Sequence, residues 1–293
     1  MKVLIYGKYL DTDDLRYVKQ VLGLLEQEQI DYRVHQRFAD TINVHEFMIH
    51  EQQIVRDTSE VAVFSPDICI SMGGDGTILT ASTIIQELEI PILGINLGRL
   101  GFLASTEKVV IEEAIQKVKN RDYVIEKRTM ICLESNIPAF AGETFALNDF
   151  TLHKRDTSSM VTIHTYINGE FLNSYWADGI IVSTPTGSTG YNLSCGGPII
   201  YPGSQNFVIT PVAPHNLNVR PLIVSDSSTI ALEIEGRSEN FMCTLDSRYE
   251  TVTTEHKLSI SKCAFHTNLV RLEDSSFLQT MRDKLAWGRD SRN

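Results

Sequence analysis

Short apolar runs alternate with helical spacing in the first part of the chain. Residues 3–7 are apolar enough for a buried strand, and residues 11–29 repeat apolar positions every three or four residues, as an amphipathic helix does. The same alternation predicts strands at 32–35, 67–72 and 91–96 and helices at 78–89 and 111–118. Strands that alternate with helices are typical of parallel β-α-β units whose sheet is covered on both faces.

The pattern changes near Tyr123 and is strand-like from there to about Arg271. Residues 160–167 and 170–176 flank Asn168-Gly169, a dipeptide typical of a tight type I′ hairpin turn. A short helix is predicted after residues 186–188, and residues 275–287 return to helical spacing. Further strands are predicted at 144–154, 179–183, 207–212, 222–224, 229–235, 241–245, 257–261 and 269–273. So many short strands indicate a mostly antiparallel β domain.

The composition and net charge of the chain indicate which kinds of molecule it can bind. Hydrophobic residues make up 42% of the chain and charged residues 22%, which is an ordinary globular balance. The formal net charge is −11, and because nucleic acid demands clustered Lys and Arg, we expect no nucleic-acid partner. No apolar run approaches the roughly 20 residues that span a bilayer, and the N-terminus lacks the long apolar region of a signal peptide. We therefore expect a cytoplasmic protein with no membrane partner.

Five cysteines are scattered along the chain, at Cys69, Cys132, Cys195, Cys243 and Cys263. Their number is odd and none forms a C-x-x-C motif, so the sequence implies neither a disulfide framework nor a zinc site. We expect reduced thiols and no metal held by protein side chains.

The most informative segment is residues 71–77, where a predicted strand meets a predicted helix. The glycines Gly73, Gly74 and Gly76 let the backbone approach a phosphate, and a helix N-terminus presents free N–H groups to anions. Asp75 stands among them as a carboxylate, which repels phosphate unless it accepts a hydroxyl proton or holds Mg²⁺. The alternative is a tight turn in which Asp75 only caps the helix. The loop has neither the Walker A ending nor G-x-G-x-x-G, which excludes both of those mechanisms.

Gly73-Gly74-Asp75-Gly76-Thr77 resembles the signature shared by NAD kinases, diacylglycerol and sphingosine kinases and, more loosely, 6-phosphofructokinases. This signature implies phosphoryl transfer from a nucleotide to an alcohol. Residues 96–103 resemble the second glycine-rich stretch of NAD kinases, in which Gly98 and Gly101 allow a close-packed loop beside the first. Arg99 in this stretch is a candidate phosphate ligand, with an ordinary surface arginine as the alternative.

Two further segments resemble the NAD kinase family more specifically. Asn148-Asp149 stands where the family has Asn-Glu, so the carboxylate is one methylene shorter. Residues 176–194 resemble the NAD-binding core. In it Asp178 precedes a predicted buried strand, where a carboxylate needs a ligand or a donor, and Tyr191 offers a flat face for stacking. The family usually has Ala in place of Gly190, and Gln where this chain has Arg248 in a late loop.

The resemblance implies an N-terminal Rossmann-like α/β domain and a C-terminal β-sandwich domain, with NAD between them. We expect the first over residues 1–124 and 270–293 and the second, which binds NAD, over residues 125–269. The resemblance assigns NAD binding to Asp75, Gly76, Asn148, Asp149, Asp178, Thr186, Thr189, Gly190, Tyr191, Asn192, Leu193, Ser194 and Ala213. It assigns the phosphates of ATP to Gly73, Gly74, Gly76, Thr77 and Arg99.

The activity implied by this resemblance is transfer of the γ-phosphoryl group of ATP to the 2′-hydroxyl of the adenosine ribose of NAD. Asp75 would accept or orient the hydroxyl proton, and Mg²⁺ or another divalent cation would accompany ATP. Family members are commonly tetramers or dimers, so we expect a homo-oligomer. Two alternatives stay open, a lipid kinase that shares the glycine loop and a non-catalytic module that binds NAD.

Overall fold

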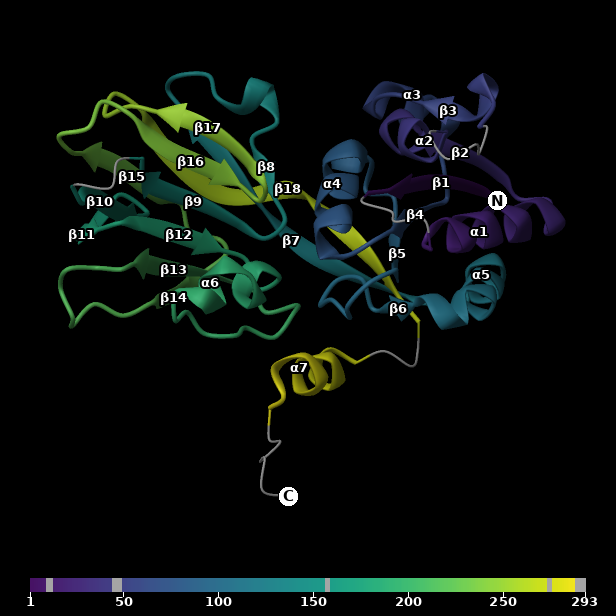
Figure 1. Cartoon of the computed structure of the whole chain (residues 1–293). Coiled ribbons are helices and arrows are strands. Elements are labelled where there is room, and N and C mark those ends of the chain that lie inside the picture. The colour runs from purple at the N-terminus through teal and green to yellow at the C-terminus, as the bar shows by residue number, and fades with distance from the viewer. Residues whose placement is uncertain (9–12, 44–48, 156–158, 273–275, 288–293) are drawn as a thin grey trace. The chain divides into compact units, whose positions relative to one another are not determined.

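The computed structural model of the chain is shown in Figure 1. It divides into two compact units, Met1–Lys127 with Thr267–Asn293 and Arg128–His266. Three residues at the ends of predicted elements lie outside the described residues: Asp11 of the helix predicted at 11–29, Glu273 of the strand at 269–273 and Ser275 of the helix at 275–287. The structure describes residues 1–8, 13–43, 49–155, 159–272 and 276–287.

The first unit is built on a parallel sheet. Its strands are β1 (Lys2–Gly7), β2 (Asp31–His35), β3 (Ile54–Val55), β4 (Ile68–Met72), β5 (Ile92–Asn96) and β6 (Thr106–Glu107). They follow the order β5-β4-β1-β2-β3, with β6 also paired to β5. Every residue of β4 and β5 is buried, as expected for strands covered on both faces.

Helices connect these strands, as the alternating pattern predicted. They are α1 (Leu15–Gln27), α2 (Gln36–Asn43), α3 (Thr58–Phe64), α4 (Asp75–Ile85) and α5 (Ile111–Asn120), and α7 (Phe277–Leu285) closes the unit. α1 buries Val18, Val21, Leu22 and Leu25, which is the spacing of one helical face. α2 and α3 are seven or eight residues long and were not predicted, because so short a pattern gives a weak periodic signal.

The second unit consists mainly of strands, which confirms the predicted β domain. Six form one antiparallel sheet in the order β14 (Leu222–Ser225), β13 (Asn206–Val212), β12 (Gly179–Ser183), β9 (Asp149–Lys154), β16 (Phe241–Leu245) and β17 (Arg248–Val252). The others are β7 (Val124–Ser135), β8 (Phe145–Ala146), β10 (Val161–Ile167), β11 (Glu170–Ala177), β15 (Ile230–Glu235) and β18 (Lys257–Arg271). A short helix, α6 (Tyr191–Ser194), follows the predicted turn.

Three expectations about the strands need correction. Residues 144–154 form two strands, β8 and β9, instead of one, because the chain turns at Leu147-Asn148. Residues 257–261 and 269–271 belong to the single long strand β18, whose last part pairs with β5 of the first unit. β7 and β17 were not predicted at all.

The hairpin at Asn168-Gly169 is confirmed. It joins β10 to β11, and both residues have positive φ, 52° and 83°, as a type I′ turn requires. The side chain of Asn168 also accepts a hydrogen bond from the Thr229 N–H at 2.9 Å, which ties the turn to β15.

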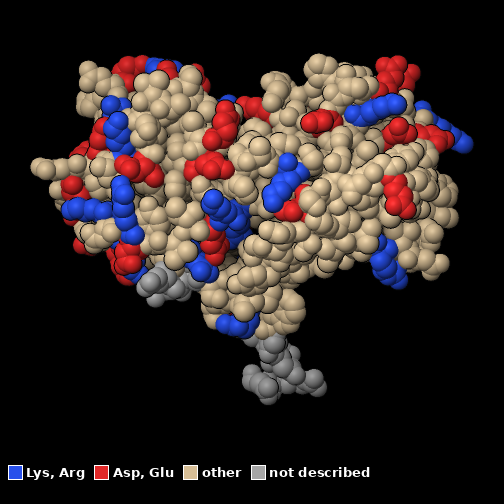
Figure 2. Space-filling model, turned by 180° about the vertical axis from the view of Figure 1, so that it is seen from behind, with Lys and Arg blue, Asp and Glu red and all other residues tan. Residues whose placement is uncertain are grey.

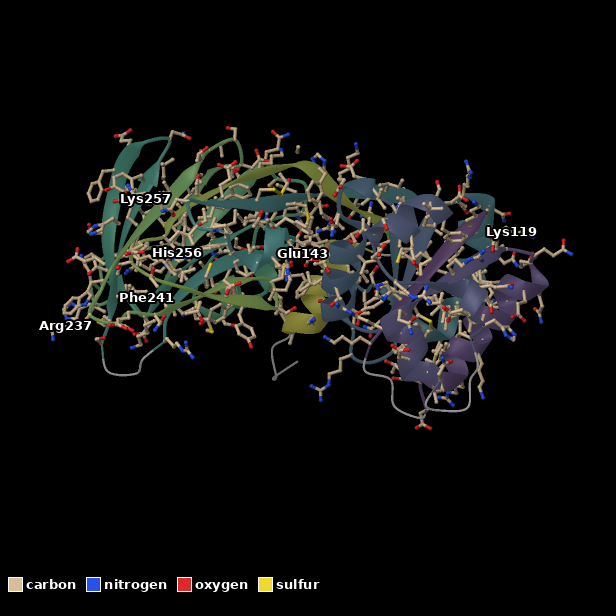
Figure 3. All side chains as sticks on the ribbon, turned by 90° about the horizontal axis from the view of Figure 1, so that it is seen from above. Lys119, Glu143, Arg237, Phe241, His256 and Lys257 are labelled. Carbon is tan, nitrogen blue, oxygen red and sulfur yellow. A yellow bond between two sulfur atoms is a disulfide. The ribbon has the colours of Figure 1, made fainter. Side chains whose placement is uncertain are left out.

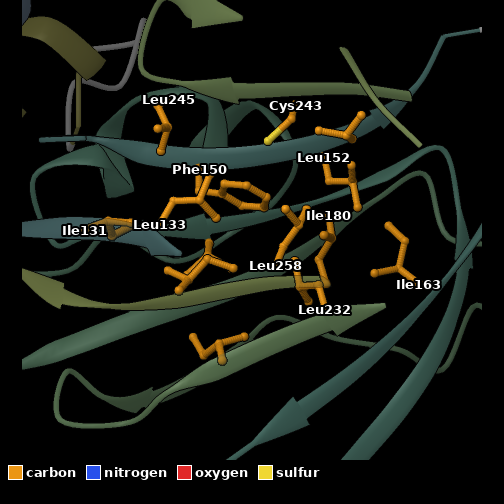
Figure 4. Close-up of a cluster of buried hydrophobic side chains, with 14 of the residues drawn as sticks. Ile131, Leu133, Phe150, Leu152, Ile163, Ile180, Leu232, Cys243, Leu245 and Leu258 are labelled. Atoms are coloured by element: carbon orange, nitrogen blue, oxygen red, sulfur yellow. The ribbon is translucent and has the colours of Figure 1, made fainter. Parts of the chain in front are cut away.

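The core of the second unit lies between its two sheets (Figure 4). Phe150 and Ile180 of the six-stranded sheet and Leu232 and Leu258 of β15 and β18 are at most 1% exposed. The burial of these apolar side chains is the main contribution to the free energy that holds the two sheets face to face. The unit is therefore a β-sandwich.

The expectation of five reduced thiols is wrong for two of them. Cys132 on β7 and Cys263 on β18 form a disulfide, with their Cα atoms 4.9 Å apart. β7 pairs with β18, which brings together two cysteines that are 131 residues apart in sequence. The thiols of Cys69, Cys195 and Cys243 are free.

Basic and acidic side chains are interspersed on the face shown in Figure 2. Across the residues that the structure describes, no helix is both long and apolar enough to cross a membrane. The same residues contain no group of three or more His, Cys, Asp or Glu side chains arranged to hold a metal ion.

Candidate active site

The glycine loop lies where β4 ends and α4 begins. The N–H of Gly73 donates to the carbonyl of Ile95 at 2.9 Å, so the loop is held against β5. Gly73 has φ of 148°, and a Cβ there would lie 2.3 Å from the hydroxyl of Thr77. Only glycine fits this position. Gly74 and Gly76 are exposed, so the start of α4 presents its backbone to solvent.

Asp75 is the first residue of α4, but it does not cap that helix. Its carboxylate accepts hydrogen bonds from the N–H groups of Phe102, Leu103 and Ala104, at 2.8, 2.9 and 3.0 Å. A Cβ at Gly101 would lie 1.9 Å from the nearer carboxylate oxygen, so the glycine makes room for this contact. The alternative of a simple helix cap is therefore wrong, and the two glycine-rich loops pack together as expected.

The last helix also meets this loop. Lys284 of α7 lies 3.8 Å from the Oδ2 atom of Asp75, and its ammonium lies 5.0 Å from the centre of the Phe102 ring. Phe277, at the start of the same helix, packs against Phe102 with ring centres 5.9 Å apart. Sequence reasoning missed Lys284, because nothing local marks a lysine some two hundred residues from its carboxylate.

Arg99 lies in the turn after β5, and Asn96 holds this turn. The side chain of Asn96 donates to the carbonyl of Arg99 at 2.7 Å and accepts from the N–H of Gly98 at 2.9 Å. The guanidinium of Arg99 is exposed and forms no ion pair with any described residue. An exposed cation fits either a phosphate ligand or a surface arginine, so the assignment stays a prediction.

In the second unit, Asn148 and Asp149 are held from behind by Asp246. The Asp246 carboxylate accepts from the N–H groups of Leu147, Asn148 and Asp149, at 2.9, 2.7 and 3.2 Å. Asp246 occupies the turn between β16 and β17 with φ of 53°. Its part in fixing the Asn-Asp pair was not predicted, because it depends on the pairing of β9 with β16.

The side-chain oxygens of Asn148 and Asp149 accept no hydrogen bond from the part of the chain that the structure describes. The Oδ1 atom of Asn148 is buried and has no hydrogen bond among the residues described. The Asp149 carboxyl, on a residue only 6% exposed, likewise accepts none from them. Burial first, and then the nearby charge of Asp246, raise the pKa of Asp149 to about 7. Burial also raises the pKa of Asp246, and its three N–H donors and the charge of Arg248 oppose that rise.

The turn at residues 184–190 packs closely on the Asn-Asp pair. A Cβ at Gly187 would lie 2.1 Å from the carbonyl oxygen of Asn148, so only glycine permits this approach. Gly190 faces the side chains themselves, since a Cβ there would lie 3.8 Å from both Asn148 Nδ2 and Asp149 Oδ2. The predicted residues Asn148, Asp149 and Gly190 thus come together.

Asp178 and Tyr191 lie near this turn, each with a partner. Asp178 pairs with Lys154 at 2.5 Å, which supplies the donor that a carboxylate before a buried strand requires. The ring of Tyr191, which is 41% exposed, packs against the imidazole of His153 with ring centres 5.5 Å apart. Burial lowers the pKa of His153, which favours a neutral imidazole beside the tyrosine.

The other expected NAD residues differ in exposure. Asn192 is fully buried and its amide is used inside the protein, bonding the carbonyls of Ser188 and Pro198 and the hydroxyl of Thr210. It therefore shapes the turn from behind. Thr186 is buried, Thr189 and Leu193 are half-buried, and Ser194 and Ala213 are exposed.

Arg248, at the start of β17, is held by contacts with residues 143 and 145. Its guanidinium donates to the backbone carbonyls of Glu143 and Phe145 and lies 5.1 Å from the centre of the Phe145 ring. It also pairs with the Glu143 carboxylate at 3.5 Å (Glu143 is labelled in Figure 3). The arginine thus fastens β8 beside the Asn-Asp pair.

Comparisons with known sequences identify the same two parts. The description "ATP-NAD kinase N-terminal domain" matches residues 14–123, and "ATP-NAD kinase C-terminal domain" matches residues 147–272. A protein named NAD kinase from Cytophaga hutchinsonii is 47% identical over 289 residues, which is 99% of either chain. Another of that name, from Bacteroides fragilis, is 39% identical over the full length of both chains.

Comparisons with solved structures show the same fold. The crystal structure of yeast NADH kinase complexed with NADH aligns with a TM-score of 0.87 at 22% identity, over 99% of this chain and 88% of that one. An NAD kinase from Archaeoglobus fulgidus in complex with ATP aligns with a TM-score of 0.75 at 23% identity, over 98% of each chain. The predicted fold class, an α/β unit followed by a β-sandwich, is confirmed.

Proposed function

This chain belongs to the NAD kinase family, and on that premise we propose that it transfers the γ-phosphoryl group of ATP to the 2′-hydroxyl of the adenosine ribose of NAD. The structural observation that carries the proposal is the pair Asn148-Asp149. The fold anchors its backbone on Asp246, yet no described residue forms a hydrogen bond with Asn148 Oδ1 or with the carboxyl of Asp149. Buried polar groups without partners are costly, so they fit a ligand that supplies hydroxyl donors, such as a ribose.

The proposed NAD contacts are the groups that the second unit leaves free. Asn148 and Asp149 take the ribose hydroxyls, and the exposed ring of Tyr191 stacks on a base. Gly190 leaves room beside the pair, and Asp178, fixed by Lys154, accepts from an amino group or hydroxyl. The remaining proposed NAD contacts come from the turn after β12, from α6 and from the residue after β13, and they are Thr186, Thr189, Leu193, Ser194 and Ala213. Asn192 is buried and supports this turn through its hydrogen bonds inside the protein.

The proposed phosphate contacts belong to the first unit. The exposed backbone of Gly74 and Gly76 at the start of α4 suits an anion, and the guanidinium of Arg99 supplies charge. A divalent cation would accompany the ATP phosphates, because Mg²⁺ is usually held by one or two carboxylates together with substrate phosphates. When bound there, it neutralises charge on the transferring group.

Asp75 is the proposed catalytic residue. A carboxylate offers about four lone-pair directions, and three of those of Asp75 are filled by the N–H groups of residues 102–104. The remaining direction accepts the 2′-hydroxyl and orients its oxygen toward the phosphorus. Because phosphoryl transfer has a loose transition state, the proton passes to the Asp75 carboxylate late, as the ribose oxygen bonds to phosphorus and the bond from phosphorus to the leaving ADP breaks.

The experiment that tests this function is a coupled assay of NADP formation with purified protein. NADP formed from NAD and ATP supports it, and parallel reactions with inorganic polyphosphate and with NADH define the donor and the acceptor. Phosphorylation of diacylglycerol without NADP formation would instead favour a lipid kinase. NAD binding by calorimetry without turnover under any donor would favour a non-catalytic module.

We propose further that the chain works in the cytoplasm as a homo-oligomer. β14 ends the six-stranded sheet, and it exposes Leu222 and Ile223 by 36% and 48%. A free strand edge with exposed apolar side chains favours association with another chain. Light scattering coupled to gel filtration tests this, and a monomer at micromolar concentration contradicts it.

A further inference from the structure

The C-terminal helix α7 meets the second glycine-rich loop at two places. Phe277 at its start packs on the Phe102 ring, and Lys284 near its end lies over the same ring and beside Asp75. The N–H of Phe102 in turn donates to Asp75 Oδ2, the oxygen that faces the lysine. Lys284, Phe102 and Asp75 therefore form a closed set of contacts, unlike an isolated surface ion pair, which contributes little.

The hydrogen bonds of Asp75 determine where a substrate hydroxyl can approach it. Oδ1 accepts from both Leu103 and Ala104, which fills its two lone pairs. Oδ2 accepts only from Phe102, so it holds the one acceptor direction that remains. Lys284 Nζ lies 3.8 Å from this oxygen. Any hydroxyl that binds the free direction of Asp75 is thus close to an ammonium group.

We propose that Lys284 is a positioning residue for phosphoryl transfer, which brings α7 into the reaction centre of the first unit. It holds the Asp75 carboxylate and the loop of residues 101–104 in place, and its charge favours the oxygen from which the proton departs. This inference rests on the proposed kinase function. It predicts that the length and charge of the side chain at position 284 set the turnover rate more than the affinity for NAD.

The test compares two substitutions of Lys284 with a control on the same helix. Lys284→Gln removes the charge, and Lys284→Arg retains it. Arg282→Gln removes a charge about half a turn away, where the guanidinium donates to Gln279 within α7 at 2.6 Å. Full-length variants are assayed for kcat and KM, and amide hydrogen exchange is followed on the peptide that spans residues 99–106.

Loss of the ammonium should lower kcat at least about tenfold with KM for NAD within about twofold, as for one electrostatic contact made in the transition state. Lys284→Arg should recover most of the rate, and Arg282→Gln should match the wild type. Exchange at residues 102–104 should be faster in Lys284→Gln alone. An unchanged kcat in Lys284→Gln overturns the proposal, as does an equal loss in Arg282→Gln.

Amide hydrogen exchange distinguishes a failure of this proposal from a failure of the proposed kinase function. If the wild type forms no NADP, the kinase assignment fails. Faster exchange in Lys284→Gln then still supports the contact between α7 and the loop, and unchanged exchange overturns it.

Discussion

The Asp246 carboxylate accepts the N–H of Asn148 at 2.7 Å, so a turn almost one hundred residues away fixes the backbone of the proposed ribose site. The same carboxylate accepts the N–H groups on either side of Asn148. An anion that receives three backbone donors is a strong anchor, because each charge-assisted hydrogen bond is about twice as strong as a neutral one. We therefore expect Asp246 to support NAD binding through the backbone of residues 147–149.

Replacing Asp246 with Ala should destabilise the protein and weaken NAD binding together. Three buried N–H groups would lose their acceptor, at a cost of about 1–3 kcal/mol for each one that water does not reach. We expect a lower midpoint in urea unfolding and a KM for NAD raised about tenfold. Glu239→Ala, at an exposed acid in the turn before β16, serves as the control and should leave both unchanged. Equal effects of the two substitutions would contradict the anchoring role.

Gly101→Ala should disable the reaction centre. The added methyl would lie 1.9 Å from Asp75 Oδ1, and the clash forces either the loop or the carboxylate to move. Misplacement of a reacting group by about 1 Å costs on the order of 10²-fold in rate. Gly98→Ala is the matched control, because a Cβ there meets nothing within 4 Å. Measured kcat should fall in the first variant and stay within about twofold in the second; similar rates would refute the close packing.

Asp75→Asn should lower kcat by at least about 10²-fold while NAD binding is largely kept. The amide has a single acceptor oxygen, so its NH₂ group must face either N–H donors of residues 102–104 or the ammonium of Lys284. Calorimetric titration with NAD separates binding from turnover. Near-normal turnover of this variant would remove Asp75 from the catalytic role, and a lost NAD affinity would show that the whole loop had moved.

Local patterns in the sequence were sufficient for much of this site. The glycine loop was predicted because Gly73, Gly74 and Gly76 have their effect within a few residues, between a strand and a helix that periodicity also predicts. The mostly antiparallel β domain was predicted from its many short strands and the Asn168-Gly169 turn, whereas the β-sandwich was implied by the family resemblance. Which residues bind NAD and ATP stays a prediction that followed from family resemblance.

The contacts that connect distant segments could not be predicted. Asp75 meets residues 102–104 only because β4 and β5 are neighbours in the sheet. Lys284 reaches Asp75 from the far end of the chain. Cys132 and Cys263 also come together only because their strands pair. The odd number and scattered positions of the five cysteines therefore led to the wrong prediction of reduced thiols at these two residues. Periodicity carries no information about which elements become neighbours.

Asp149 should give the folded protein a pH-dependent stability. Burial raises its pKa to about 7 from an ordinary value of 3.8, so the folded state holds the proton more tightly than the unfolded state does. Its contribution to stability is therefore complete below about pH 4 and is lost as the pH rises through about 7. A rise in pKa from 3.8 to about 7 corresponds to at most about 4 kcal/mol of stability.

Asp149→Asn should remove this dependence, since an amide does not titrate. Urea unfolding at pH 5 and pH 8 should show a smaller fall in stability for the variant than for the wild type, by about 2 kcal/mol or more. NAD binding by the wild type should weaken as the pH falls below about 7, because only the ionised carboxylate can accept hydrogen bonds from both hydroxyls of a ribose. Glu239→Gln, at an exposed position, should keep the wild-type slope. If Asp149→Asn has the same slope as the wild type, the carboxyl is ionised in the folded protein and another group governs the dependence.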